Sequence, residues 1–385
     1  MTFATPVMTR RRFQATALAS LVAGPAALRN SFAQGGRILL GQSSPFTGPS
    51  GDLGVQFNAG AKVFFELLNA RGGVGGRGIE LVSLDDGYEP DRCAANTERL
   101  IGQDVLALFG YYGTNSCRAA MPMAIKAGVP FFAPSNGSMT LREPHNRLVF
   151  HMRASYEDET AAMINQLDTI GLKKVAVFYQ NDGYGEGGMT GVSKALAAQS
   201  RKPVSTATIE RNSAAVTPDM VRTLLAAKPD AIIQICTYKA AAAMIREARK
   251  AGFGGQFYNV SLVGTRPLAE ELGKLASGVI VTQVLPSPHA GMAPLSREFQ
   301  AAVAKHGKKV DINYTSFEGY VAAKLFADGL ARAGGRITRE TLVSGLESIG
   351  SADYGGFPIS LSSTKHVASR FVEKSMMSGD GKFRV

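Results

Sequence analysis

From residue 38 onward, short apolar and β-branched runs alternate with longer amphipathic segments. The runs at 38–43 and 79–85 predict strands. Between them, apolar residues recur every three or four positions: Leu53, Phe57, Ala61, Phe64 and Leu68. This spacing predicts a helix over 52–70, which the Gly72-Gly73 pair ends. The alternation continues with predicted helices at 91–102 and 116–127 and predicted strands at 105–110, 129–133 and 147–152. Such an array favours a parallel sheet covered by helices on both faces, because each crossover returns the chain to the same sheet.

A second array of the same kind follows residue 155. Ser155 and Asp158 have the spacing of a capping box, which predicts a helix running to Ile170. Further strands are predicted at 175–179, 204–209, 231–236 and 278–283, and helices at 186–198, 218–227 and 239–250. Three more predicted helices, at 296–306, 315–333 and 338–349, lack a full set of strands. We therefore expect an α/β protein of two doubly wound parallel-sheet lobes, with the late helices completing the first lobe.

The N-terminus has the pattern of an export signal. Residues 1–33 contain no acid, and an apolar stretch at 15–28 follows the run Thr9-Arg10-Arg11-Arg12-Phe13. This resembles a twin-arginine signal peptide, and the small residues Ser31 and Ala33 predict cleavage after Ala33. The alternative is a disordered basic start. After Gln34 no apolar run approaches the ~20 residues of a membrane span, so we expect a soluble mature protein in the periplasm.

Composition and charge exclude several function classes. The chain of 385 residues carries a formal charge of +11, and four of its arginines lie in the predicted signal. No basic run is interleaved with aromatics, so we expect no nucleic-acid partner. The 5 histidines and 3 cysteines show no metal-ligand spacing, and no nucleophile lies near a histidine and a carboxylate in the predicted array. We therefore predict no catalytic residue, metal or cofactor. Cys93 and Cys117 are the one plausible disulfide pair, with free thiols as the alternative.

Glycine, hydroxyl and amide residues gather where the predicted strands end. They lie in the segments 43–48, 111–116, 134–138 and 181–185. Backbone N–H groups at helix starts favour a carboxylate or a similar anion, although each segment taken singly has the simpler role of capping a helix. Because the carboxyl ends of parallel strands share one sheet edge, four such segments favour a ligand site in a cleft between the lobes.

Several motifs together resemble a known family. They are Ser44-Pro45-Phe46-Thr47-Gly48-Pro49 with Gly51 and Gly54, Asn69-Ala70-Arg71-Gly72-Gly73-Val74, Asp85-Asp86, Gly128-Val129-Pro130, Asp182-Gly183-Tyr184-Gly185-Glu186-Gly187 and Glu318-Gly319-Tyr320-Val321-Ala322-Ala323. In this order the motifs resemble the periplasmic binding proteins of the branched-chain amino acid type, fold type I. The resemblance implies an ABC-transporter solute receptor that closes on a small molecule and delivers it to a membrane permease. A sensory receptor on the same fold is the alternative, and an enzyme is the least favoured.

The resemblance also implies how the chain is divided between the lobes. It implies three crossings, near residues 153–156, 282–286 and 354–357. We expect a signal peptide at 1–33, the first lobe at 34–153, the second lobe at 154–283, completion of the first lobe at 284–354, and a return to the second lobe with a C-terminal tail at 355–385.

Carried over position by position, the resemblance implies a set of ligand contacts. The hydroxyl that takes the ligand carboxylate matches Thr114, next to Asn115, and the partner loop matches Ser135, Asn136 and Gly137. The tyrosine that closes over the ligand matches Tyr184. A second aromatic contact falls at Tyr238, or at Thr237 with a shift of one residue.

The sequence departs from the family pattern at Ser261. The acid that family members use to hold an α-ammonium falls near this residue, and residues 259–266 contain no Asp or Glu. An ammonium buried without a counter-charge costs several kcal/mol. We therefore expect a ligand without an amine, such as an aromatic or branched short-chain carboxylate, or a neutral amide or urea.

Overall fold

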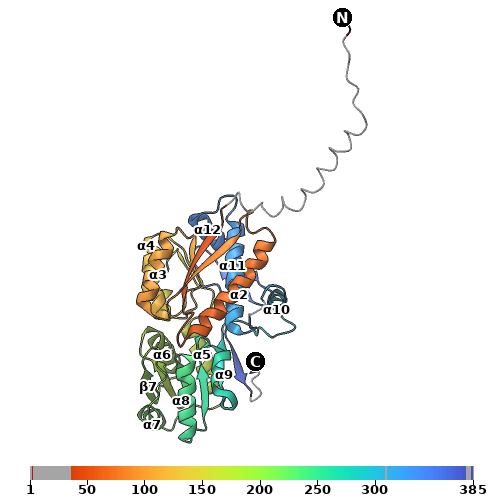
Figure 1. The fold of residues 1–385 in the computed structure, drawn as a ribbon. Helices are drawn as coiled ribbons and strands as arrows, with labels where there is room; N and C mark the ends of the chain where they lie inside the picture. The colour runs from red at the N-terminus through yellow and green to blue at the C-terminus, as the bar shows by residue number, and fades with distance from the viewer. Residues whose placement is uncertain (1, 3–35, 308–309, 379–382, 385) are drawn as a thin grey trace.

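The computed structural model describes residues 36–307, 310–378 and 383–384, together with Thr2. The predicted export signal lies outside the described residues. Figure 1 shows two lobes, with α2, α3, α4, α11 and α12 in the first and α6 to α9 in the second. Within the described part of the chain, no helix has the length and apolar character needed to cross a membrane.

The first lobe is built on a five-stranded parallel sheet of order β2-β1-β3-β4-β5. Its strands are β1 (Ile38–Ser44), β2 (Ile79–Asp85), β3 (Ala107–Phe109), β4 (Phe131–Phe132) and β5 (Val149–Phe150). Its helices are α2 (Gly51–Ala70), α3 (Pro90–Gly102), α4 (Thr114–Lys126), α10 (Pro294–His306), α11 (Tyr314–Arg332) and α12 (Arg339–Glu347). Neighbouring residues of β3 face opposite sides, so Leu108 packs with α3 and α4 while Phe109 packs with α2 and α11.

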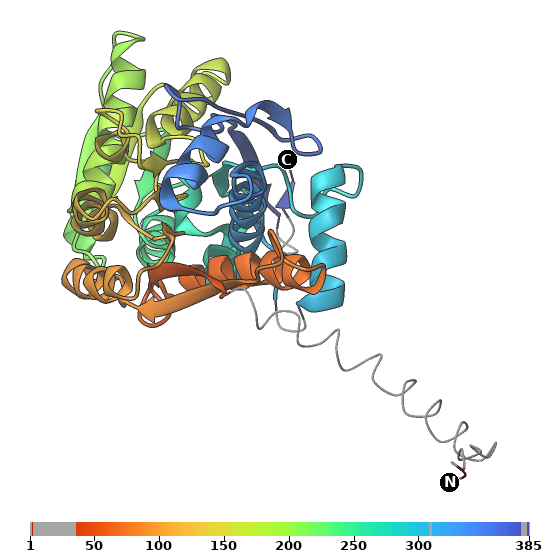
Figure 2. The same ribbon diagram turned by 90° about the horizontal axis from the view of Figure 1, so that it is seen from above.

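The late helices pack into this lobe. Helix α11 lies against α2 so closely that a Cβ on Gly60 would sit 1.7 Å from the Ser316 carbonyl oxygen. In the same way, a Cβ on Gly319 would sit 2.0 Å from the Phe57 carbonyl oxygen, so each helix needs glycine where the other crosses it. Seen from above, α10 stands beside α2 at the edge of the lobe (Figure 2).

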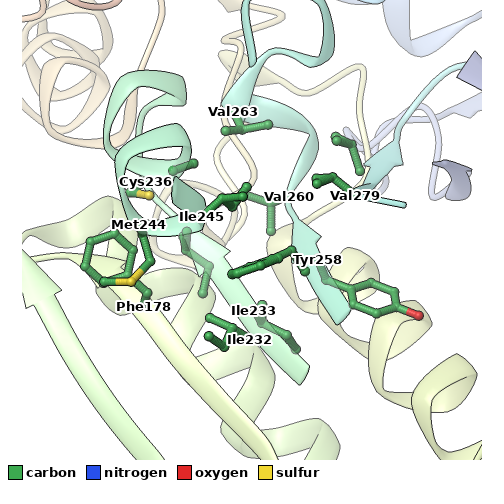
Figure 3. Close-up of a cluster of buried hydrophobic side chains, with 14 of the residues drawn as sticks. Phe178, Ile232, Ile233, Cys236, Met244, Ile245, Tyr258, Val260, Val263 and Val279 are labelled. Atoms are coloured by element: carbon green, nitrogen blue, oxygen red, sulfur yellow. The ribbon is translucent and has the colours of Figure 1, made fainter. Parts of the chain in front are cut away.

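The second lobe has a seven-stranded sheet of order β14-β13-β10-β9-β8-β6-β7. Its strands are β6 (Val175–Gln180), β7 (Ser205–Ile209), β8 (Ala231–Ile235), β9 (Gln256–Asn259), β10 (Ile280–Gln283), β13 (Glu373–Met377) and β14 (Phe383–Arg384). Its helices are α5 (Tyr156–Thr169), α6 (Gly183–Ala197), α7 (Pro218–Leu225), α8 (Tyr238–Lys250) and α9 (Thr265–Leu272). The last two strands pair antiparallel at one edge. In its core, Ile233 of β8 and Ile245 of α8 gather with Val260 and Val279 (Figure 3).

The chain passes between the lobes three times. Met152 belongs to the core of the first lobe and α5 begins the second, while β10 leaves the second lobe and Leu285 joins the first. The third passage lies later than the sequence suggested. Phe357 is buried in the core of the first lobe, because the hairpin of β11 (Gly350–Asp353) and β12 (Pro358–Leu361) packs there before the chain reaches β13.

Local signals set the element boundaries. Ser155 accepts from the Asp158 N–H at 3.0 Å and donates its own N–H to the Asp158 carboxylate at 2.9 Å, which confirms the predicted capping box. The sequence did not predict β9, α9 or the hairpin, because these elements are short and their apolar periodicity is weak. Cys93, Cys117 and Cys236 are buried free thiols.

Candidate functional site

The two lobes contact each other across the edge where their parallel strands end. The Asn115 side chain donates to the Asp182 carboxylate at 2.8 Å, and the Tyr112 hydroxyl donates to the Leu262 carbonyl at 3.1 Å. At the rim, Glu89 pairs with Arg211 at 3.0 Å. The structure therefore holds the cleft closed.

Thr114 and Asn136 form a polar pair on the first lobe. Thr114 is the first residue of α4, two residues before the predicted helix start, and it is fully buried. Its hydroxyl accepts from the Asn136 side chain at 2.7 Å, and the Asn136 oxygen accepts from the Ser138 N–H at 2.7 Å. Asn136 thus holds the Thr114 hydroxyl at the start of a helix, where the helix dipole favours an anion.

Gly137 and Tyr184 are both placed by Tyr156. The Gly137 carbonyl accepts from the Tyr156 N–H at 2.8 Å, and a Cβ on Gly137 would lie 2.4 Å from the Tyr156 ring. The Tyr184 ring centroid lies 5.4 Å from that of Tyr156. Tyr184 belongs to the first turn of α6, because Asp182 caps that helix by accepting from the Tyr184 and Gly185 N–H groups. Glycine at 137 lets the two lobes meet at Tyr156.

Ser261 and Ser135 are linked by an arginine that the sequence did not single out. Arg153 lies in the first crossing and is 1% exposed. Its guanidinium donates to the hydroxyl of Ser261 and, at 3.3 Å, to the hydroxyl of Ser135. Its Nε has no hydrogen-bond partner among the residues that the structure describes. A cation therefore touches the Ser261 hydroxyl.

Two buried carboxylates balance this arginine. Glu159 of α5 lies 3.5 Å from it and Glu318 of α11 lies 3.3 Å from it. Burial opposes the charge of Arg153, but the two carboxylates outweigh that effect and raise its pKa. Burial also raises the pKa of Glu318, and the attraction of Arg153 offsets this only in part. Glu318 thus takes up a proton more readily than an ordinary glutamate does.

Tyr238 lies apart from this cluster. It lines a surface hollow of about 430 Å³ at the rim, together with Asp52, Pro267 and Glu270. Among the described residues, no hydrogen bond links it to Thr114 or the arginine. The structure therefore brings together Thr114, Ser135, Asn136, Gly137, Tyr184 and Ser261, with Asn115 on the neighbouring contact, and leaves Tyr238 at the mouth.

The sequence also missed three tyrosines beside Tyr184. Tyr88 and Tyr112 come from the first lobe, with ring centroids 5.7 Å apart, and Tyr156 begins α5. Tyr112 stands in a strand-end segment that the sequence did single out, and Tyr88 follows β2 by three residues. An aromatic residue just after a strand end is the signal that could have found Tyr88 and Tyr112, whereas Tyr156 follows no strand end directly.

Comparison with known proteins identifies the fold and the family. The periplasmic binding protein family matches residues 37–372. A solved structure from Rhodopirellula baltica, described as a possible leucine/isoleucine/valine-binding protein, is 32% identical, covers 90% of this chain and 96% of that one, and has a TM-score of 0.86. The Leu/Ile/Val-binding protein homolog 7 of Brucella abortus is 25% identical over 77% of this chain and 78% of its own length. An amino acid binding protein of Pseudomonas aeruginosa is 30% identical over 39% of this chain, and the match spans 41% of that protein. The chain therefore belongs to the periplasmic binding protein family, whose members bind small solutes in the periplasm.

Proposed function

We propose that this protein is the substrate-binding component of an ABC importer, exported by its N-terminal signal, which delivers a small carboxylate without an amine to a membrane permease. Thr114, Ser135 and the start of α4 hold the carboxylate, and closure brings Tyr184 over the ligand. The hydrogen bond from Asn115 to Asp182 supports this role, because it joins the first turn of α4 to the cap of α6 across the cleft.

One observation carries the proposal for the ligand: the guanidinium of Arg153 contacts Ser261. By the family resemblance, Ser261 stands where relatives place the acid that holds an ammonium. Here the residue is a neutral serine whose hydroxyl contacts a cation, so an α-ammonium would meet repulsion in a buried site. A carboxylate, in contrast, finds the unpartnered Nε of the same guanidinium.

The nearby carboxylates do not replace the missing acid. Glu159 already accepts from the Ser261 N–H at 2.7 Å and from the Thr282 hydroxyl at 2.5 Å, besides its ion pair with Arg153. Both oxygens of Glu318 lie within 3.4 Å of Arg153. Each carboxylate is therefore already paired with Arg153. An incoming ammonium would have to compete with the fixed guanidinium for the same carboxylate.

From the same cluster of Arg153, Glu159 and Glu318 we expect the protein to take up protons when the ligand binds. A bound carboxylate near Arg153 adds negative charge beside Glu318 and raises the pKa of that carboxyl further. A pKa that is higher in the bound state means that affinity falls as pH rises through the titration of Glu318. Calorimetry in buffers of different ionisation enthalpy measures this uptake directly, and Glu318→Gln should abolish it.

The experiment that tests the ligand class compares leucine with 4-methylpentanoate, which differs from leucine only by lacking the amine. Thermal unfolding of the purified protein should shift with 4-methylpentanoate and not with leucine, since a ligand at 100 times its dissociation constant adds about 2.7 kcal/mol. Thr114→Val removes the proposed carboxylate contact at little change in volume and should abolish the shift. A larger shift with leucine contradicts the proposed ligand class.

The transport role has its own test. Cells that lack this gene should lose uptake of the radiolabelled ligand, and the intact gene should restore it. A gene with Thr114→Val should be expressed and exported without restoring uptake. Unchanged uptake in the deletion strain contradicts the proposed role in import.

A further inference from the structure

Four tyrosine rings, two from each lobe, meet where the cleft closes. Tyr88 and Tyr112 come from the first lobe, Tyr156 and Tyr184 from the second, and each is at most 4% exposed. All four belong to the buried core of the second lobe, which also takes in Leu53 of α2 from the first lobe. Because the pair Tyr88 and Tyr112 and the pair Tyr156 and Tyr184 belong to different lobes, opening the hinge separates them into two facing aromatic walls.

The backbone fixes the position of these rings. The Tyr88 N–H donates to the Asp86 carboxylate at 2.9 Å, and Tyr88 has a φ of 68°. A Cβ on Gly113 would lie 2.4 Å from the Tyr88 ring, so this ring rests directly on the backbone, as the Tyr156 ring does on Gly137. Both glycines belong to the first lobe, and each leaves the ring that rests on it little freedom to tilt.

The Tyr112 hydroxyl donates to the Leu262 carbonyl at 3.1 Å, whereas the hydroxyls of the other three tyrosines are weakly paired. The Tyr156 hydroxyl has no hydrogen-bond partner within the described ranges of the chain. The Tyr184 hydroxyl donates to the Cys236 carbonyl at 3.4 Å, and the Tyr88 hydroxyl accepts from Gln180 at 3.4 Å. A buried hydroxyl without a good partner is costly, so these groups are available to a ligand.

The charged end of the site lies beside two of the rings. The Tyr156 N–H donates to the Gly137 carbonyl, and Gly137 follows Asn136, whose side chain donates to the Thr114 hydroxyl. The Tyr112 hydroxyl donates to the carbonyl of Leu262, the neighbour of Ser261, whose hydroxyl accepts from Arg153. The cluster thus has an aromatic part and, at the hinge side, a cationic and hydroxyl-bearing part.

We infer that the ligand is an aromatic carboxylate, whose ring lies between the tyrosine walls while its carboxylate reaches Thr114, Ser135 and the Nε of Arg153. This inference rests on the proposed function and specifies its substrate class. A flat ring offers both faces to tyrosines of opposite lobes, in the offset and tilted arrangements that aromatic pairs prefer. A trimethylammonium group also binds aromatic cages, but here the charge of Arg153 beside two of the rings opposes a second cation.

The test is a factorial set of four compounds. Leucine and 4-methylpentanoate have a branched aliphatic side chain, whereas phenylalanine and 3-phenylpropanoate have a ring, and each pair differs by the amine. Choline serves as the cationic probe. The chain has 11 tyrosines and no tryptophan, so the change in tyrosine fluorescence on titration reports on the rings of the site. We expect 3-phenylpropanoate to bind at least tenfold more tightly than 4-methylpentanoate.

Variants connect this preference to the rings. Tyr88→Leu keeps apolar bulk but removes a ring, and should reduce the preference for 3-phenylpropanoate at least fivefold, while Tyr88→Phe should retain it. Tyr179→Leu is the matched control, because Tyr179 is a half-buried tyrosine of β6 outside the four-ring cluster. Far-ultraviolet circular dichroism confirms that each variant is folded before its titration.

Each outcome decides a different point. Equal affinity for 3-phenylpropanoate and 4-methylpentanoate overturns the aromatic preference and leaves the proposed carboxylate class intact. Tighter binding of phenylalanine than of 3-phenylpropanoate contradicts the exclusion of an amine but supports the aromatic preference. Binding of choline alone, or of none of the ring compounds, overturns the inference.

Discussion

Asp86 allows the cost of a buried charge next to the cleft to be measured. It is fully buried at the end of β2, where one carboxylate oxygen accepts from the Ser43 hydroxyl at 2.8 Å and the other from the Tyr88 N–H. Burial, with a contribution from the neighbouring charge of Asp85, raises the pKa of Asp86 from 3.8 to about 6. A rise of about two pKa units corresponds to about 3 kcal/mol.

The sign of the effect follows from the raised pKa. The native state binds the Asp86 proton more tightly than the unfolded chain does, so the destabilisation is absent below pH 4 and is complete above pH 7. Asp86→Asn removes this titration and keeps an oxygen for the Tyr88 N–H. The amide is neutral and forms weaker hydrogen bonds, which lowers the stability of the variant by about 1 kcal/mol at every pH. The stability of the variant relative to the wild type should therefore increase by about 3 kcal/mol between pH 4 and pH 8.

Urea unfolding followed by circular dichroism at five pH values measures this difference. Asp85→Asn is the matched control. Hydrogen bonds from Thr47, the Phe46 and Gly87 N–H groups and Arg92 outweigh burial and lower the pKa of Asp85 to about 2, so that its contribution is already complete above pH 5. The control should lose stability by a constant amount from pH 5 to pH 8. A flat difference between Asp86→Asn and the wild type would refute the reasoning about Asp86.

Three further substitutions test the hinge, the helix packing and the rim. Arg153→Met leaves two buried carboxylates without their cation and should cost about 3–5 kcal/mol of stability in urea, and a loss below 1 kcal/mol would contradict the ion-pair account. Gly60→Ala should cost roughly 1–3 kcal/mol, because its Cβ would meet the backbone of α11, while Gly102→Ala, with no atom within 4 Å, should cost almost nothing. Glu89→Gln breaks the rim ion pair with Arg211 and should speed ligand release by about threefold in stopped-flow experiments at low salt, an effect that high salt should erase.

The alternation of strands and helices could be predicted from the sequence, because the apolar periodicity is strong and capping residues indicate where helices begin. The predicted strand at 79–85 coincides with β2, and the predicted helix after Ser155 begins where its capping box lies. The site was readable only in part. Thr114 and Ser135 follow strands and match positions of the family pattern. Arg153 is different, because its role depends on ion pairs with Glu159 and Glu318, which lie 6 and 165 positions away in the sequence, and no local pattern reveals such pairs.

The division of the first lobe between distant parts of the chain has a consequence for the order of folding. The five parallel strands of the second lobe and their helices come from one stretch, residues 156–283, so its contacts form without long loop closures. The first lobe needs α11, whose glycine-mediated contact with α2 joins residues 60 and 316. During synthesis the first lobe, although it is made first, has to wait for the last quarter of the chain. The parallel part of the second lobe is the earlier to become native, and β13 and β14 join its edge last.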